Sequence, residues 1–161
     1  TSEGTLTGHY IDTGVPHVVI FVADVAPVNV GGLGPEIRHH PLFPRGCNVN
    51  WAGRIGDNAF RMRTYERGVE AETLSCGTGA TAIALIAARL GLAKPPVTIH
   101  ASGGGKLTIA FDETPAVGSP AGESLGRSFH NVRTTVEVER IAEGVLDAEW
   151  LARRDLAFAT A

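Results

Sequence analysis

The segment from Tyr65 to Gly79, YERGVEAETLSCGTG, contains the residues best suited to chemistry. Cys76 comes directly before a Gly77-Thr78-Gly79 turn that opens into an apolar helix. Amide N–H groups at a helix N-terminus have no partner inside the helix, and together with the helix dipole they stabilise an anion. We therefore expect the pKa of Cys76 to fall from its usual ~8.5 into a reactive range. We also expect the amides of Gly77, Thr78 and Gly79 to hold a substrate carboxylate.

Two further groups could serve such a thiol. Glu66 and Arg67 supply a carboxylate and a bidentate cation a few residues before it, and His17 has an imidazole that titrates near neutral pH. Each has a structural alternative. Glu66 and Arg67 could form a surface ion pair, His17 could be satisfied by backbone, and Cys76 could be a small buried hydrophobe.

The sequence favours neither a metal site nor a disulfide. His39 and His40 are adjacent and have no cysteine or carboxylate at zinc-ligand spacing, so we interpret them as loop residues. Gly103–Gly105 lacks the Gly-Lys-Ser/Thr ending of a phosphate loop. Cys47 lies in a Pro/Gly loop and nothing else is typical of a secreted protein, so we expect both cysteines to be free thiols.

The elements that must position these residues follow from hydrophobic periodicity. One helix is predicted at Ala80–Leu90; it is apolar nearly all round, which indicates burial, and Gly91 is placed to cap it. Strands are predicted at His17–Val22, Asn48–Ile55, Ala59–Arg67, Val97–His100, Lys106–Phe111 and Val132–Arg140. The second and third of these strands should pair as a hairpin, and so should the fourth and fifth.

The remaining segments are predicted to be less regular. Gly31–Pro35 is rich in turn residues, Ile37–Pro41 suits a short helix or an extended loop, and Asp112–Phe129 is typical of an exposed loop. A terminal helix is predicted at Asp147–Arg154. The sum is one α+β domain over residues 1–161, in which mostly antiparallel strands wrap around one buried central helix.

Composition narrows the classes of partner. The chain has 161 residues, of which 43% are hydrophobic, and its formal net charge is -3. Without an excess or a run of Lys and Arg we expect no nucleic-acid binding. The apolar runs are far shorter than the ~20 residues of a membrane span, and the first residues do not resemble a signal peptide. We therefore expect a cytoplasmic protein that does not bind membranes.

Four motifs carry a family resemblance. They are TGVPHVVIFV at Thr13–Val22, RHHPLFPRGCNVNW at Arg38–Trp51, YERGVEAETLSCGTGA at Tyr65–Ala80, and the later GGGKLTIAF. In this order they resemble the second of the two similar domains of diaminopimelate epimerase, from about Asp12 to about Leu146.

The resemblance implies a fold of two pseudo-symmetric domains, each with strands around a central helix, and a substrate in the cleft between them. It implies epimerisation of LL-diaminopimelate to the meso form, a step of lysine and peptidoglycan biosynthesis, with no cofactor and no metal. One cysteine from each domain faces the α-carbon. One thiolate removes the α-proton, and the other thiol delivers a proton to the opposite face.

The same resemblance assigns roles residue by residue. Cys76 is the acid/base thiol of this domain, and the Gly77 and Thr78 amides bind the reacting carboxylate. Glu66 tunes a thiol or contacts the substrate ammonium. At the distal end of the substrate, Arg67 holds a carboxylate and Asn48 donates or accepts a hydrogen bond. His17 adjusts the pKa of the partner cysteine.

The chain also departs from the family pattern. Val15 stands where many members have an asparagine that contacts substrate. We expect the first domain, with its own cysteine, to be absent, and Cys47 sits at the wrong motif position to replace that cysteine. We therefore expect no epimerisation by this chain without an N-terminal half. The family also suggests a homodimer. Two alternatives stay open: a relative of the proline and hydroxyproline racemases, and a non-catalytic domain that keeps only the carboxylate pocket.

Overall fold

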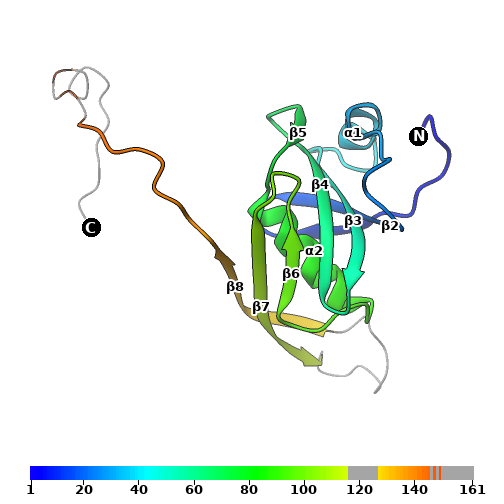
Figure 1. The fold of residues 1–161 in the computed structure, drawn as a ribbon. Coiled ribbons are helices and arrows are strands. Elements are labelled where there is room, and N and C mark those ends of the chain that lie inside the picture. The colour runs from blue at the N-terminus through cyan, green and yellow to red at the C-terminus, as the bar shows by residue number, and fades with distance from the viewer. Residues whose placement is uncertain (116–126, 146, 148, 150–161) are drawn as a thin grey trace.

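A computed structural model describes residues 1–115, 127–145, 147 and 149 of the chain. Within these residues, eight strands and two helices form the fold (Figure 1). The helices are α1 (Val30–Arg38) and α2 (Gly77–Arg89). The strands are β1 (His9–Asp12), β2 (Pro16–Val22), β3 (Asn48–Gly56), β4 (Ala59–Glu66), β5 (Ala71–Thr73), β6 (Val97–His100), β7 (Lys106–Pro115) and β8 (Arg127–Val136).

All eight strands belong to one sheet, in the order β1-β2-β3-β4-β6-β7-β8, and β5 pairs with the end of β4. Both predicted hairpins, β3 with β4 and β6 with β7, are confirmed. Five of the seven strand pairs are antiparallel, as expected, whereas β2–β3 and β4–β6 are parallel. The parallel pair β2–β3 places His17 opposite Asn48.

The central helix is α2, and strands from both ends of the sheet contact it. Nine of its residues are buried, which confirms the helix that the apolar run predicts. The helix ends at Arg89, one residue before the predicted end at Leu90. Gly91 follows as the expected capping glycine, with a left-handed φ of 71°, and the Gly91 and Leu92 amides donate to the Ala88 and Ala87 carbonyls. Its start differs from the prediction, because Gly77-Thr78-Gly79 forms its first turn and Cys76 is the N-cap.

Helix α1 lies where the sequence predicts a turn-rich stretch at Gly31–Pro35, so that prediction was wrong. Of the uncertain segment Ile37–Pro41, only the first two residues belong to this helix. Three glycines and a proline in nine residues disfavour a helix. Burial compensates: Leu33 and Ile37 enter a core, and a Cβ at Gly34 would lie 2.5 Å from the Tyr65 ring.

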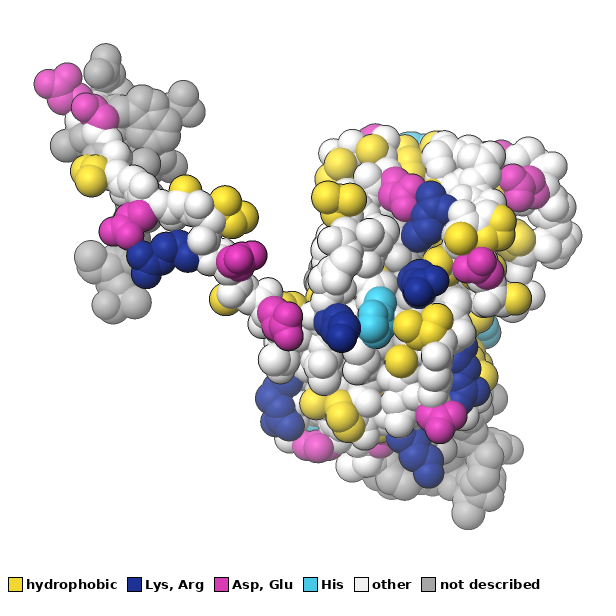
Figure 2. All heavy atoms as spheres, viewed as in Figure 1, with side chains coloured by type: hydrophobic (Ala, Val, Ile, Leu, Met, Phe, Trp, Pro, Cys, Tyr) yellow, Lys and Arg dark blue, Asp and Glu magenta, His cyan; other side chains and the backbone are white. Residues whose placement is uncertain are grey.

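The prediction of a loop at Asp112–Phe129 was wrong at both ends, because β7 continues to Pro115 and β8 begins at Arg127. Residues 116–126 between them lie outside the described part. The strand predicted at Val132–Arg140 ends at Val136. Beyond it an irregular segment leaves the sheet with exposed apolar side chains, Val138 at 89% and Ile141 at 95% (Figures 1 and 2). The helix predicted at Asp147–Arg154 falls outside the described residues except for 147 and 149.

Alternate residues of the inner strands pack into two separate cores, one on each face of the sheet. In β2, Val19 joins the core around α2, while Val18 and Ile20 join the core around α1. This period-two pattern is what places His17, two residues before Val19, on the α2 face. No helix in the described part of the chain is long and apolar enough to cross a bilayer. On the face shown in Figure 2, charges of both signs are interspersed.

Candidate active site

Cys76 occupies the junction between the sheet and the central helix. Its backbone is extended, as an N-cap requires, and its Sγ accepts a hydrogen bond from the Gly79 amide at 3.3 Å. The Thr78 hydroxyl lies 3.6 Å from the same sulfur. Only 8% of the residue is exposed. The thiol is therefore held by the first turn of α2 and faces a limited opening.

The expectation of a lowered pKa at Cys76 was wrong. Burial raises the pKa of this thiol, and the donors from Thr78 and Gly79 offset only part of that rise. The neighbouring Glu66 carboxylate raises it further, because a second negative charge beside a thiolate is unfavourable. The helix terminus acts in the expected direction, but desolvation outweighs it. Cys76 is a protonated thiol at neutral pH.

The amides of α2's first turn are not equivalent. The Gly79 amide donates to Cys76 and so is not available to a ligand, contrary to expectation. Gly77 and Thr78 remain exposed, and a Cβ at Gly77 would meet nothing within 4 Å. These two amides precede the intrahelical hydrogen bonds and face open space. The structure thus leaves Gly77 and Thr78, and not Gly79, as candidates to bind an anion.

Glu66 and Arg67 stand where β4 ends, and they are not a surface ion pair with one another in the structure. The Glu66 carboxylate accepts a hydrogen bond from the Thr73 hydroxyl at 2.7 Å and lies beside the Cys76 thiol. The Arg67 amide donates to the Asn48 side chain at 2.8 Å, and its guanidinium donates to the Arg45 carbonyl at 3.0 Å. The end of β4 therefore links the thiol to Asn48.

His17 and Asn48 are neighbours across β2 and β3, and both are buried. Burial lowers the pKa of His17 to about 4; Asp12 works against this shift and Arg67 adds to it. The imidazole is therefore neutral at pH 7, and its Nδ1 lies 3.1 Å from the Asn50 amide nitrogen. The contact is to a side chain, so the backbone-satisfied alternative for His17 does not describe this ring.

One end of the α2 face of the sheet gathers most of the candidate residues. The register of β2, β3 and β4 turns five polar side chains to the same face: His17, Asn48, Asn50, Thr64 and Glu66. Cys76, the N-cap of α2, lies over the same face of the sheet. Cys47 does not join them, because it packs fully buried in the other core, with its pKa raised to about 11 by burial. Both cysteines are free thiols, as expected.

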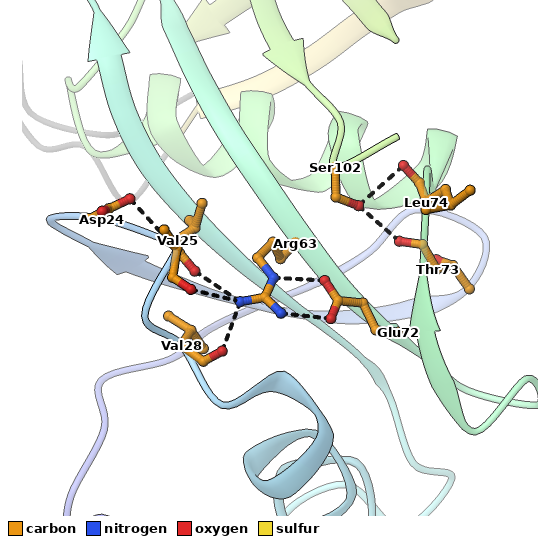
Figure 3. Close-up of polar contacts among 9 residues, drawn as sticks. Asp24, Val25, Val28, Arg63, Glu72, Thr73, Leu74 and Ser102 are labelled. Carbon is orange, nitrogen blue, oxygen red and sulfur yellow. Dashed lines mark hydrogen bonds and ion pairs between the residues drawn. The ribbon is translucent and has the colours of Figure 1, made fainter. Parts of the chain in front are cut away.

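Arg63, which no sequence motif indicates, holds the strand leading to Cys76 (Figure 3). Arg63 forms a two-pronged ion pair with Glu72 at 2.7 Å and donates to the Val25, Ala26 and Val28 carbonyls. Beside it, the Ser102 hydroxyl reaches the Thr73 and Leu74 carbonyls. These contacts fix β5 and thereby Thr73, the partner of Glu66. Only the spacing of alternate strand residues could have indicated Arg63, and nothing in the sequence pairs it with Glu72.

The His39-His40 pair lies at the exposed end of α1, where His39 is 3.6 Å from Glu70. Among the described residues, no group of three or more His, Cys, Asp or Glu side chains is arranged to hold a metal ion.

Comparison with known proteins adds a family match over most of the chain. The family model of diaminopimelate epimerase matches residues 9–124. A diaminopimelate epimerase of Aquifex aeolicus is 51% identical over 66% of this chain and 39% of its own length. That of Methanocella arvoryzae is 52% identical over 63% and 36%, and that of Gemmatimonas aurantiaca is 41% identical over 86% and 48%. The chain spans less than half the length of these relatives.

Proposed function

Because the chain belongs to the diaminopimelate epimerase family, we propose that it supplies one half of an active site that epimerises LL-diaminopimelate to the meso form. The observation that carries the proposal is the placement of Cys76. Its thiol lies at the junction of the free amides of α2, the Glu66 carboxylate and the polar end of the sheet. The second thiol comes from residues beyond these 161, since Cys47 lies in the other core.

Inversion at an α-carbon requires a base on one face and an acid on the other. Cys76 begins as the acid, because burial and Glu66 keep it protonated. The partner cysteine, as a thiolate, takes the α-proton, and the Cys76 S–H gives its proton to the opposite face. Cys76 ends as a thiolate, which the Gly79 amide stabilises as hydrogen-bond donor. In the reverse reaction the two thiols exchange roles, and no cofactor takes part.

The substrate is held at both ends. The Gly77 and Thr78 amides bind the reacting carboxylate and stabilise the negative charge that develops there. Arg67 pairs with the distal carboxylate, and Asn48 hydrogen-bonds the distal end. Glu66 has a second role as a contact for the substrate ammonium. The exposure of the Gly77 and Thr78 backbone, and the link from the Arg67 amide to Asn48, support this division.

His17 serves the partner cysteine. A neutral imidazole beside that sulfur adjusts its pKa by hydrogen bonding, which agrees with the lowered pKa of His17 itself. We place the reaction in the cytoplasm, as a step of lysine biosynthesis on a free amino acid. The working unit contains the N-terminal half and is a homodimer.

The test is deuterium incorporation at the α-carbon of LL-diaminopimelate in D2O. We expect none with this chain alone, and exchange when the part of a family member that it does not span is added. The variant Cys76→Ala should abolish formation of the meso product by the combined halves, because Cys76 delivers the proton to the second face, whereas the matched variant Cys47→Ala should retain it. Absence of exchange from the combined halves would favour the non-catalytic carboxylate-binding alternative, and exchange of free proline would favour the racemase alternative.

A further inference from the structure

Asn50 lies at the centre of the polar end of the sheet. It is fully buried on β3, between β2 and β4. Its side-chain nitrogen lies 3.0 Å from the Val18 carbonyl and 3.1 Å from His17 Nδ1. Its side-chain oxygen accepts from the Thr64 hydroxyl at 3.1 Å. All the polar atoms of this amide are therefore in use.

These contacts fix the position of the imidazole proton. A backbone carbonyl only accepts hydrogen bonds, so the Asn50 atom that faces Val18 must be the amide nitrogen. The same NH₂ group meets His17 Nδ1, which must therefore accept and carries no proton. In a neutral imidazole the proton then resides on Nε2. The structure agrees, since burial keeps this ring neutral.

The Nε2 atom of His17 is buried and has no hydrogen-bond partner among the described residues. A buried N–H donor without an acceptor is unfavourable by ~1–3 kcal/mol. Its acceptor should therefore come from outside the described residues.

We propose that Asn50 is a positioning residue that locks His17 in the Nε2–H tautomer, so that the ring presents a donor to the acceptor that completes the site. This inference rests on the proposed function for the identity of that acceptor, the partner thiolate. A donor stabilises a thiolate, whereas the other tautomer would present a lone pair and repel it. Asn50 thus determines which side of the reaction starts as the base.

The first turn of α2 keeps Asn50 in place. A Cβ at Gly79 would lie 2.3 Å from the Asn50 oxygen and 3.2 Å from Cys76 Sγ. The glycine therefore lets the helix turn that bears the thiol rest directly on this amide. Asn50 contacts the Cys76 turn on one side and His17 on the other, and it has no free space in which to rotate.

The first measurement is the tautomer of His17 in the unmodified chain, by long-range ¹H–¹⁵N NMR of ¹⁵N-histidine-labelled protein at pH 7. The His17 signals are assigned by their loss in His17→Gln. We expect the Nε2–H pattern. A protonated Nδ1, in either the other tautomer or the imidazolium, would overturn the inference without the use of any Asn50 variant.

The second measurement compares Asn50→Asp with Asn48→Asp. A carboxylate at position 50 can only accept, so the proton of His17 should move to Nδ1. The pKa of His17 should rise, because the new negative charge favours the imidazolium as Asp12 does. Asn48 is two residues away on the same strand and bonds to the Pro16 carbonyl, so the same change there should leave the tautomer unaltered. An Nε2–H pattern in Asn50→Asp would overturn the lock.

The third measurement is turnover of the combined halves. Asn50→Asp should lower kcat on the order of 10²-fold with little change in KM, because Asn50 is buried and touches no substrate. A raised KM at unchanged kcat would overturn the positioning role. If the unmodified halves do not turn over at all, the proposed function fails, and the NMR spectra still decide what Asn50 does to His17.

Discussion

Because the first turn of α2 contacts Asn50, Gly79 is the glycine of the site that least tolerates a side chain. In Gly79→Ala the new Cβ would lie 2.3 Å from the Asn50 oxygen, whereas ordinary contact begins at 3.4 Å. The oxygen or the helix turn must therefore move by roughly 1 Å, in a part of the core where overpacking costs ~1–3 kcal/mol. Moving Asn50 also strains its hydrogen bonds, each of which contributes ~1 kcal/mol.

Gly77→Ala is the matched control, since it makes the same substitution in the same helical turn. A Cβ there meets nothing within 4 Å, and neither glycine has a positive φ. Alanine favours a helix over glycine by up to ~1 kcal/mol, so this variant should be as stable as the unmodified chain or slightly more stable.

Thermal unfolding followed by circular dichroism measures the difference between the two variants. We expect Gly79→Ala to be less stable than Gly77→Ala by about 2 kcal/mol or more, which corresponds to melting temperatures about 4–8 °C apart for a chain of this size. Equal melting temperatures would refute the close contact of the α2 turn with Asn50, and with it the restraint on that amide.

Three further predictions concern charge. Arg63→Lys should lower the free energy of unfolding in urea by about 1–3 kcal/mol, since lysine cannot form the two-pronged ion pair and reach three carbonyls; an unchanged urea midpoint would contradict the clamp. The rate at which iodoacetamide alkylates Cys76 should rise with a pH midpoint above that of a free cysteine, and Cys76 should react faster than Cys47. Glu66→Gln should lower the Cys76 midpoint, because it removes the carboxylate that opposes the thiolate. His17 binds a proton less readily in the folded state, with a pKa of about 4 against 6.5. The stability that depends on the neutral ring is complete above pH 6.5 and is lost as pH falls towards 4, by about 3 kcal/mol at most. In urea titrations at different pH, the free energy of unfolding of His17→Gln should lack this part of the pH dependence.

The sequence predicted the elements whose pattern is local. The apolar runs of α2 and β2 and the alternation in β4 are strong because packing on the sheet requires them. The sequence does not predict helix α1, because its stability comes from the fit of Gly34 against Tyr65 and not from helix propensity. The sequence predicts a loop at the ends of β7 and β8, because turn residues extend into both strands.

In the site too, residues in local motifs were predictable and tertiary contacts were not. Cys76, Glu66, Arg67 and Asn48 were found by motif, and the structure brings them to one end of the sheet. The direction of the Cys76 pKa shift could not be predicted, because desolvation depends on how deeply the helix start is buried. Asn50 could have been suspected, because it shares a strand face with Asn48. Its contacts with His17 and Thr64 needed the three-strand register.

The parallel pairing of β2 with β3 also bears on how the site forms during folding. His17 and Asn50 are 33 positions apart in the chain, and the crossover segment that joins their two strands contains α1. Contacts so distant in sequence form late, because loop closure precedes any gain from them. Helix α2 and its N-cap thiol are local and can form early. A refolding signal from the helix should therefore recover before the environment of His17, and loss of the β2–β3 pairing alone would disable the site while Cys76 kept its helix.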